Sequence, residues 1–227
     1  MELTKEQIQY IENRLENEGV KYWDIRIEML DHVVSDIEKN LTPENSEYEF
    51  KEKVQTAFVT LGWKENFNGG GLDGSDKDAL KNVNKEYRKL FFQGFVNFFK
   101  SFKNLGFLLC FVMIYYIVSN NINYTTFKRI SLVLFLLPML FFLFYSIKIW
   151  SKKYGKSIHL NYGIFYFSFA FMMLNLPIQL LKYTTQNSQK LFTILLIPIY
   201  FIATSIGFKV YQKAIAKVEK MRKELLS

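Results

Sequence analysis

The sequence has no acidic residue between Glu86 and Glu219, so the charges of residues 87–218 are all positive. Ionisable groups inside membrane helices usually mark ion paths and proton relays. The apolar segments of this stretch hold none beyond lysines at their borders, which argues against a proton- or cation-coupled transporter. It argues equally against an intramembrane protease that uses paired aspartates or a zinc site.

Cysteine is almost absent as well, and because Cys110 stands alone, an intrachain disulfide is excluded. Residues 1–18 are polar and acidic and lack the apolar core of a signal peptide, so we expect the first membrane helix to direct insertion. The sequence contains no GxSxG, Walker, CxxC or HExxH motif. These absences predict a protein that is not an enzyme and has no catalytic residue, no cofactor and no bound metal.

Four apolar runs lie within residues 87–218, each long enough for a helix that crosses a hydrocarbon core of about 30 Å. They cover about residues 102–118, 130–147, 162–181 and 191–208. The segments between and around them are alternately rich and poor in lysine and arginine, which is the positive-inside pattern with both termini cytoplasmic. Helical spans of this kind are typical of a bacterial inner membrane, since outer-membrane proteins are barrels. The lipid bilayer is therefore the first expected partner.

The net charge of +8 does not indicate a nucleic-acid partner, because it is unevenly distributed. Residues 1–62 hold 7 Lys/Arg and 14 Asp/Glu, whereas the rest of the chain holds 22 Lys/Arg and 7 Asp/Glu. An acidic soluble part is joined to a membrane part with cationic borders.

Residues 1–62 are predicted to form an acidic module of three helices, at about 4–17, 23–40 and 47–61. Thr4 and Gln7 have the spacing of a capping box, and Gly19 is a natural C-terminal stop for the first helix. Apolar residues at helical spacing give the second helix a predicted buried stripe of Trp23, Ile27, Leu30, Val34 and Ile37. A core of this size is marginal by itself, which favours docking to the membrane border or to a second copy in a homo-oligomer.

The second predicted helix also carries a polar stripe, formed by Glu28, Asp31, His32 and Asp36. His32 and Asp36 are four residues apart and so share one helix face. A metal ion would need more ligands than this face offers, although a metal-binding or pH-sensing role stays open as the less favoured alternative. We interpret the four residues as a solvated or partner-facing stripe.

One segment of the module has a family resemblance. The residues Gly19-Val20-Lys21-Tyr22-Trp23-Asp24-Ile25-Arg26-Ile27-Glu28-Met29-Leu30-Asp31-His32 are followed by Asp36-Ile37-Glu38, and later by Ala57 and Leu61-Gly62. This pattern resembles the HAAS-type helical domain at the N-terminus of many bacterial membrane proteins, over about residues 8–62. The resemblance implies a cytoplasmic sensing or signalling adaptor, often paired with a transcriptional regulator, followed by transmembrane helices and without enzymatic activity.

Residues 63–82 are rich in Gly, Asn and Asp and predict a flexible linker. Residues 83–102 then place phenylalanines at helical spacing opposite polar residues. Two interpretations of this segment stay open: a helix in the plane of the lipid headgroups, or a cytosolic extension of the first membrane helix. The last segment, 210–227, predicts a basic cytoplasmic helical tail.

Polar residues inside the predicted spans are few. Asn175 and Gln179 share a face of the third span, and Thr204 in the fourth is a candidate hydrogen-bond partner. Such contacts more often join helices than form a ligand pocket. Ala203 and Gly207 form a small-xxx-small pair that allows close helix approach, either within the bundle or in a dimer.

These observations predict an all-α integral membrane protein with an N-terminal cytoplasmic helical bundle and, in residues 83–209, an amphipathic helix and four transmembrane helices. The leading hypothesis is a non-enzymatic, membrane-anchored interaction or signalling adaptor whose module, residues 1–62, binds a cytosolic protein. The alternative is a small transporter or channel-like protein for an uncharged or anionic solute, in which prolines break the spans around a site: Pro138, Pro177 and Pro198.

Overall fold

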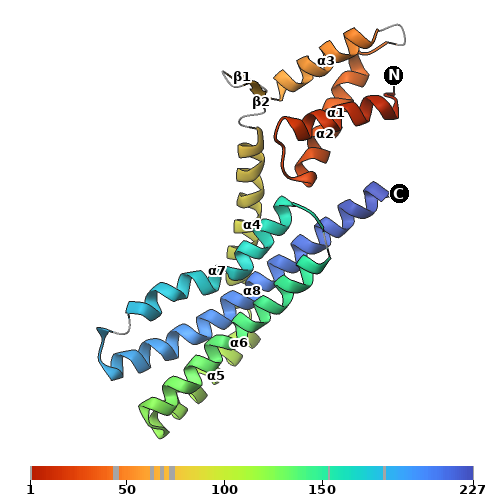
Figure 1. Ribbon diagram of the computed structural model, residues 1–227. Coiled ribbons are helices and arrows are strands. Elements are labelled where there is room, and N and C mark those ends of the chain that lie inside the picture. The colour runs from red at the N-terminus through yellow and green to blue at the C-terminus, as the bar shows by residue number, and fades with distance from the viewer. Residues whose placement is uncertain are drawn as a thin grey trace. The chain divides into compact units, whose positions relative to one another are not determined.

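A computed structural model describes residues 2–42, 46–61, 64–66, 69–71, 75–152, 154–180 and 183–226 (Figure 1). For the described residues among 64–79, and for 174–178, 180, 225 and 226, it describes the backbone alone. This part of the chain forms eight helices and one short hairpin, and it divides into two compact units. The first unit comprises Met1–Lys85, Gly155–His159 and Lys220–Ser227, and the second comprises Glu86–Tyr154 and Leu160–Glu219.

Three amphipathic helices make up most of the first unit: α1 (Lys5–Asn17), α2 (Trp23–Asn40) and α3 (Glu47–Thr60). The predicted capping box of α1 is confirmed, because Thr4 Oγ1 accepts from the Gln7 amide while the Gln7 side chain accepts from the Thr4 amide. Gly19 ends α1 with φ of +93°, a value that glycine adopts without strain.

The core of this module is closed by side chains from all three helices. Ile11, Leu15, Val33, Val54 and Phe58 are almost completely buried. The predicted apolar stripe of α2 is confirmed only at Ile37, because the residues that α2 buries are Asp24, Ile25, Met29, Val33 and Ile37, whereas Trp23, Ile27, Leu30 and Val34 are half-buried. Apolar residues occur on two sides of α2, so periodicity alone selected the wrong side.

The segment predicted as a linker, residues 63–82, holds regular structure where it is described. Strands β1 (Lys64–Asn66) and β2 (Gly69–Gly71) pair antiparallel, with Glu65 opposite Gly70. Helix α4 (Ser75–Lys100) then begins inside the predicted linker rather than at residue 83.

Three helices are long and apolar enough to cross a bilayer, among the residues that could be assessed: α5 (Phe102–Asn121), α6 (Tyr124–Ser151) and Gln186–Glu224 of α8. Helix α8 runs unbroken from Gln186 to Leu226, so the predicted basic tail continues the same helix. Helix α7 (Ile158–Leu180) covers residues 162–180 of the third predicted apolar run, and Leu181 lies outside the described residues. The all-α class is confirmed, and the three apolar helices indicate a membrane protein.

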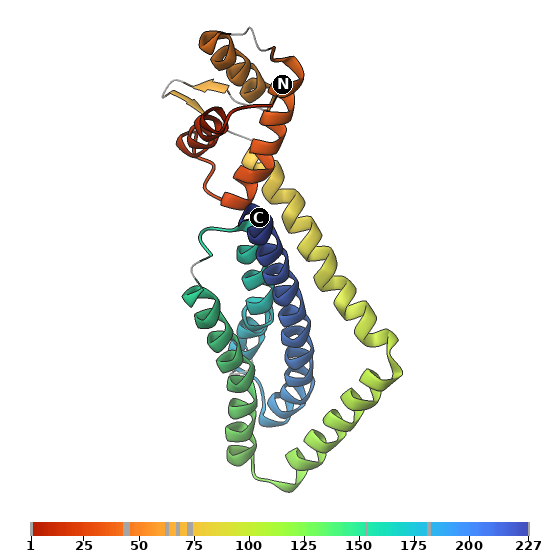
Figure 2. The same cartoon turned by 90° about the vertical axis from the view of Figure 1, so that its right-hand side faces the viewer.

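Helices α4 and α5 meet at a sharp turn (Figure 2). Ser101 lies at the turn in an extended conformation, and its hydroxyl caps α5 by accepting from the Asn104 amide. Helix α4 is therefore not a continuous extension of α5. Within the second unit its aromatic side packs on α7: Tyr87 stacks on Tyr162 with ring centroids 6.3 Å apart, and Phe91 contacts Tyr166 at 5.4 Å.

Glycines bring the helices of the second unit into close contact. A Cβ on Gly207 of α8 would lie 2.4 Å from the carbonyl oxygen of Tyr166 and 2.9 Å from Cα of Phe167, both in α7. A Cβ on Gly163 of α7 would lie 2.6 Å from the methyl of Ala214 in α8. Of the two interpretations of the small-xxx-small pair, the structure shows the one within the chain.

Candidate functional site

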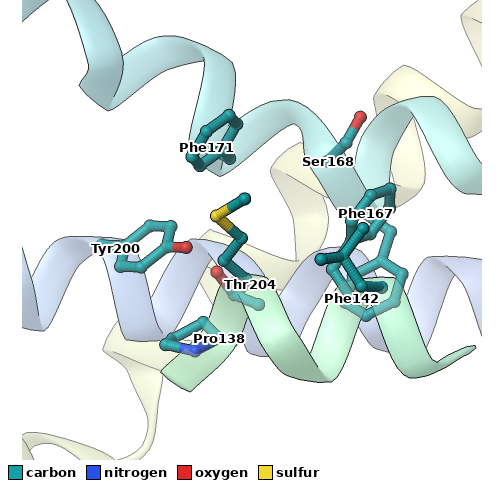
Figure 3. Close-up of a pocket in the computed structure, with 9 residues that line it drawn as sticks. Pro138, Phe142, Phe167, Ser168, Phe171, Tyr200 and Thr204 are labelled. Atoms are coloured by element: carbon teal, nitrogen blue, oxygen red, sulfur yellow. The ribbon is translucent and has the colours of Figure 1, made fainter. Parts of the chain in front are cut away.

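A cavity of about 200 Å³ lies between α6, α7 and α8 in the second unit (Figure 3). Its wall is mostly apolar and aromatic, and three of its residues carry a hydroxyl. Phe135 fixes one side of the wall, because its ring stacks on Tyr200 at 5.0 Å and packs against Phe171 at 5.8 Å. The lining residues are Pro138, Met139, Phe142, Leu143, Phe167, Ser168, Phe171, Tyr200 and Thr204.

The three polar residues predicted in the spans have different positions. Thr204 is 7% exposed and lines the cavity, and its hydroxyl has no hydrogen-bond partner among the described residues. Gln179 is exposed. The side chain of Asn175 lies outside the described residues. The predicted contact among the three stays a prediction, and only Thr204 belongs to the cavity described above.

The polar stripe predicted on α2 is exposed at all four of its positions: Glu28, Asp31, His32 and Asp36. Because these residues recur at helical spacing, they share one side of α2, away from its buried residues. Within the described part of the chain, none of the four side chains forms a hydrogen bond, an ion pair or a ring contact. Three carboxylates and one imidazole are thus presented without an internal role.

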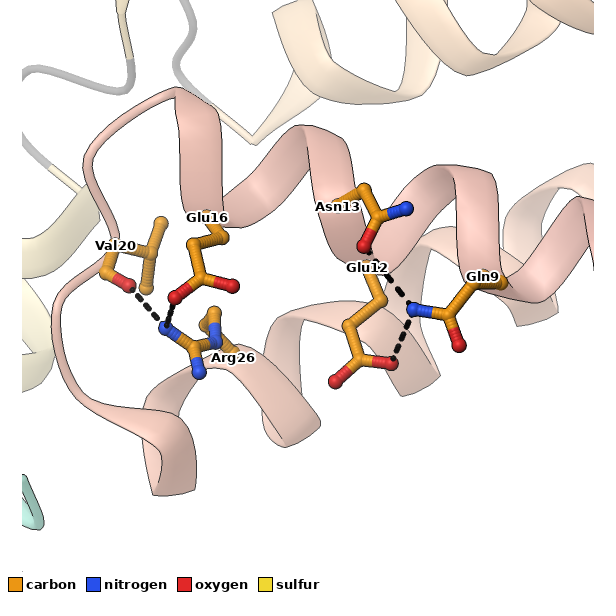
Figure 4. A network of polar contacts seen from close by, with 6 residues as sticks. All are labelled: Gln9, Glu12, Asn13, Glu16, Val20 and Arg26. Carbon is orange, nitrogen blue, oxygen red and sulfur yellow. Dashed lines mark hydrogen bonds and ion pairs between the residues drawn. The ribbon is translucent and has the colours of Figure 1, made fainter. Parts of the chain in front are cut away.

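Several polar side chains elsewhere in the module are paired (Figure 4). Arg26 Nη1 lies 3.3 Å from Glu16 Oε1 and donates to the carbonyl oxygen of Val20 at 3.1 Å, which joins α2 to α1 and to the loop between them. On α1, the Gln9 amide donates to Asn13 at 3.1 Å. These contacts stabilise the module, and the unpaired stripe of α2 contrasts with them.

The sequence pattern did not indicate the structural role of Asp24. It is 2% exposed, and its carboxylate accepts from Ser157 Oγ at 2.6 Å, from the Ile158 amide at 3.1 Å and from the His159 amide at 3.3 Å. These amides belong to the first two residues of α7, and the first N–H groups of a helix have no hydrogen-bond partner inside it. A carboxylate at this end is favoured by the helix dipole and by charge-assisted hydrogen bonds. Asp24 therefore caps α7 from a different helix.

Backbone contacts beside Asp24 reinforce this cap. The Trp23 amide donates to the carbonyl oxygen of Lys156 at 3.1 Å. Gly155 has φ of +77°, and a Cβ there would lie 3.5 Å from Trp23 Cδ1, so the indole covers the turn before α7. A signal was present in the sequence: Ser157 directly precedes an apolar helix, as capping residues do. Nothing in the local pattern linked it to Asp24.

Among the described residues, no group of three His, Cys, Asp or Glu side chains is arranged to hold a metal ion. Comparison with protein-family models, with curated proteins and with solved structures finds no match to this chain. The HAAS resemblance stays a prediction.

Proposed function

We propose that this chain is a non-enzymatic, multi-pass membrane protein whose N-terminal module binds a cytosolic protein through the polar stripe of α2. The exposed, unpaired side chains of Glu28, Asp31, His32 and Asp36 carry the proposal. Arg26 and Glu16 of the same module pair with each other, and the core is closed without the stripe. Folding therefore leaves these four residues available, and three carboxylates suit a partner with a basic surface.

The membrane part of the proposal adds α7 to the three apolar helices as a fourth span. Its 23 residues correspond to about 34 Å of helix at 1.5 Å per residue, and they include no Asp, Glu, Lys or Arg. Four spans, together with the alternation of basic and uncharged loops, support cytoplasmic N- and C-termini. The same features support the inner membrane of a bacterium as the location.

The test is affinity capture from detergent-solubilised membranes with the full-length protein and two double variants. The first, Asp31→Lys with Asp36→Lys, reverses two charges of the stripe. The control, Glu2→Lys with Glu52→Lys, reverses two exposed acids outside the stripe and so matches it in net charge. Thermal unfolding of both variants verifies that they fold like the unchanged protein.

We expect the unchanged protein and the control to retain one cytosolic protein that the stripe variant loses. Like charges at an interface weaken association strongly, so the loss should exceed ten-fold in the amount captured. Equal capture by all three proteins, or equal loss in both variants, would overturn the stripe as the binding surface.

A further inference from the structure

The cavity between α6, α7 and α8 contains a hydroxyl that the fold leaves unsatisfied. Two other hydroxyl side chains in these helices bond back to their own backbone: Thr193 Oγ1 donates to the Gln189 carbonyl at 2.6 Å, and Ser168 Oγ donates to the Phe165 carbonyl at 3.0 Å. Such back-bonding is the usual solution for Ser and Thr in helices. Thr204 differs from these two, since its buried Oγ1 has no partner in the described part of the chain. The same holds for Ser146 Oγ of α6, but Ser146 does not line the cavity.

The position of Thr204 shows where a partner would have to lie. In Figure 3 the hydroxyls of Thr204 and Tyr200 point toward the middle of the cavity. A buried hydroxyl without a partner has a desolvation cost that a ligand able to hydrogen-bond would remove. Two independent features, a mostly apolar cavity and an unsatisfied hydroxyl in its wall, therefore coincide.

We propose that this cavity binds a small neutral molecule that is mostly apolar and carries one hydroxyl or carbonyl group, which pairs with Thr204. Size follows from the volume, because an apolar cavity of about 150 Å³ accepts benzene, and about 200 Å³ leaves room for a short substituent. A single water molecule, which occupies about 30 Å³ in the liquid, would leave most of the space empty.

Neutrality follows from the lining. None of the lining residues that the structure describes is charged, and a buried charge without a partner is strongly disfavoured. The aromatic rings of Phe142, Phe167 and Phe171 suit a ring-shaped apolar portion. The site is separate from the α2 stripe and does not depend on the function proposed for it.

Three probes of similar shape separate the contributions of the hydroxyl group, the apolar ring and neutrality to binding. They are benzyl alcohol, toluene and benzylammonium. The full-length protein, labelled with ¹³C at threonine methyls, is reconstituted in nanodiscs of lipid with deuterated acyl chains. Cross-relaxation from each probe to the Thr204 methyl reports occupancy of the cavity, and the Thr193 methyl on the same helix reports nonspecific contact. Titration of the Thr204 signal gives the affinity.

Three variants complete the design. Thr204→Val removes the hydroxyl at nearly constant volume, and Thr193→Val removes a hydroxyl that already has a partner. Ser168→Leu fills the cavity from α7. Thr204→Val should unfold at the same temperature as the unchanged protein or higher, because it deletes an unsatisfied group, so a loss of binding cannot be attributed to misfolding.

We expect benzyl alcohol to bind more tightly than toluene and benzylammonium not to bind. Thr204→Val should weaken benzyl alcohol about five-fold, the equivalent of one neutral hydrogen bond, and leave toluene unchanged. Thr193→Val should change neither, and Ser168→Leu should abolish both. Equal affinity of the alcohol for the Thr204→Val and Thr193→Val proteins would overturn the proposal. So would contact of the Thr204 methyl with protonated lipid chains that no probe displaces, which would make the cavity a slot for a lipid tail.

Discussion

A buried carboxylate needs several hydrogen bonds to offset the loss of its hydration, and Asp24 has them. Its two oxygens accept from one hydroxyl and two backbone amides at the start of α7, and Oδ1 also lies 3.2 Å from the Ile25 amide. The contact joins α2 to a segment more than a hundred residues later in the chain. Asp24 is thus a buried carboxylate that also caps the start of an apolar helix.

Removal of this cap should loosen the first turn of α7. In Asp24→Ala the amides of Ile158 and His159 lose their acceptor, and we expect a loss of about 2 kcal/mol in local stability. Hydrogen exchange measured by mass spectrometry should show those amides exchanging about ten-fold faster or more. Asp31→Ala, at an exposed position of the same helix, should leave the exchange unchanged. Unaltered protection in Asp24→Ala would contradict the cap.

The two kinds of α2 residue show what sequence can predict about single positions. The exposure of Asp31 and His32 was predictable, because polar residues at helical spacing define the solvent side of an amphipathic helix. The burial of Asp24 was not, because it depends on Ser157 and the amides behind it, which the chain brings to α2 only in the folded state. Hydrophobic periodicity contains no information about such a long-range partner.

At the scale of helices, the close contact of α7 and α8 depends on small residues. Gly207 of α8 lies against the backbone of Tyr166 and Phe167, and Ala203, one turn earlier, is also buried. Association of membrane helices depends on close packing because apolar side chains gain little by leaving lipid. The contact therefore contributes directly to the stability of the second unit.

A single methyl group at this contact should be costly. Gly207→Ala places a Cβ against backbone atoms that cannot rotate away, and we expect a destabilisation of about 1–3 kcal/mol. Gly106→Ala in α5 is the matched control, since a Cβ there meets nothing within 4 Å and alanine favours the helix by up to about 1 kcal/mol. Thermal unfolding in detergent measures both. If the two variants were equally stable, the close approach at Gly207 would be refuted.

Helices could be predicted from the sequence more accurately than the segments between them. As far as the structure describes them, the long apolar runs lie inside helices, because a run of apolar residues this long needs a fully hydrogen-bonded backbone in lipid. The start of α4 at Ser75 was missed, because glycine and aspartate in residues 69–78 have turn-forming local preferences. The packing of Phe91 on Tyr166 was missed as well, since both the plane of the headgroups and a neighbouring helix accept an aromatic face.

For the whole chain, the acid-free stretch ends at both sides in an ion pair. Lys217 Nζ lies 3.5 Å from Glu86 Oε2, and Lys152 Nζ lies 2.8 Å from Glu219 Oε1. The hydrogen bond to Glu219 raises the pKa of Lys152, so this lysine stays charged throughout the physiological range. Exposed pairs contribute less than about 1 kcal/mol each. The main effect of the two ion pairs is on the position of the helices, because they join α4 and α6 to the basic end of α8.

The number of spans is the property of the whole chain on which the proposed function depends most. Cys110 is the only cysteine, so a Cys110→Ser protein provides a background for single cysteines at exposed positions. Four sites report the sides of the membrane: Tyr48, Asn121, Tyr183 and Lys223.

With four spans, a membrane-impermeant maleimide on intact spheroplasts should label Asn121→Cys and Tyr183→Cys only, and the other two sites should react after permeabilisation. If α7 did not cross, Tyr183 would be inside and Lys223 outside, because an odd number of spans puts the two termini on opposite sides. The pair Tyr183 and Lys223 therefore decides between three spans and four. Only the four-span result is compatible with a module and a basic C-terminal helix on the same, cytoplasmic side.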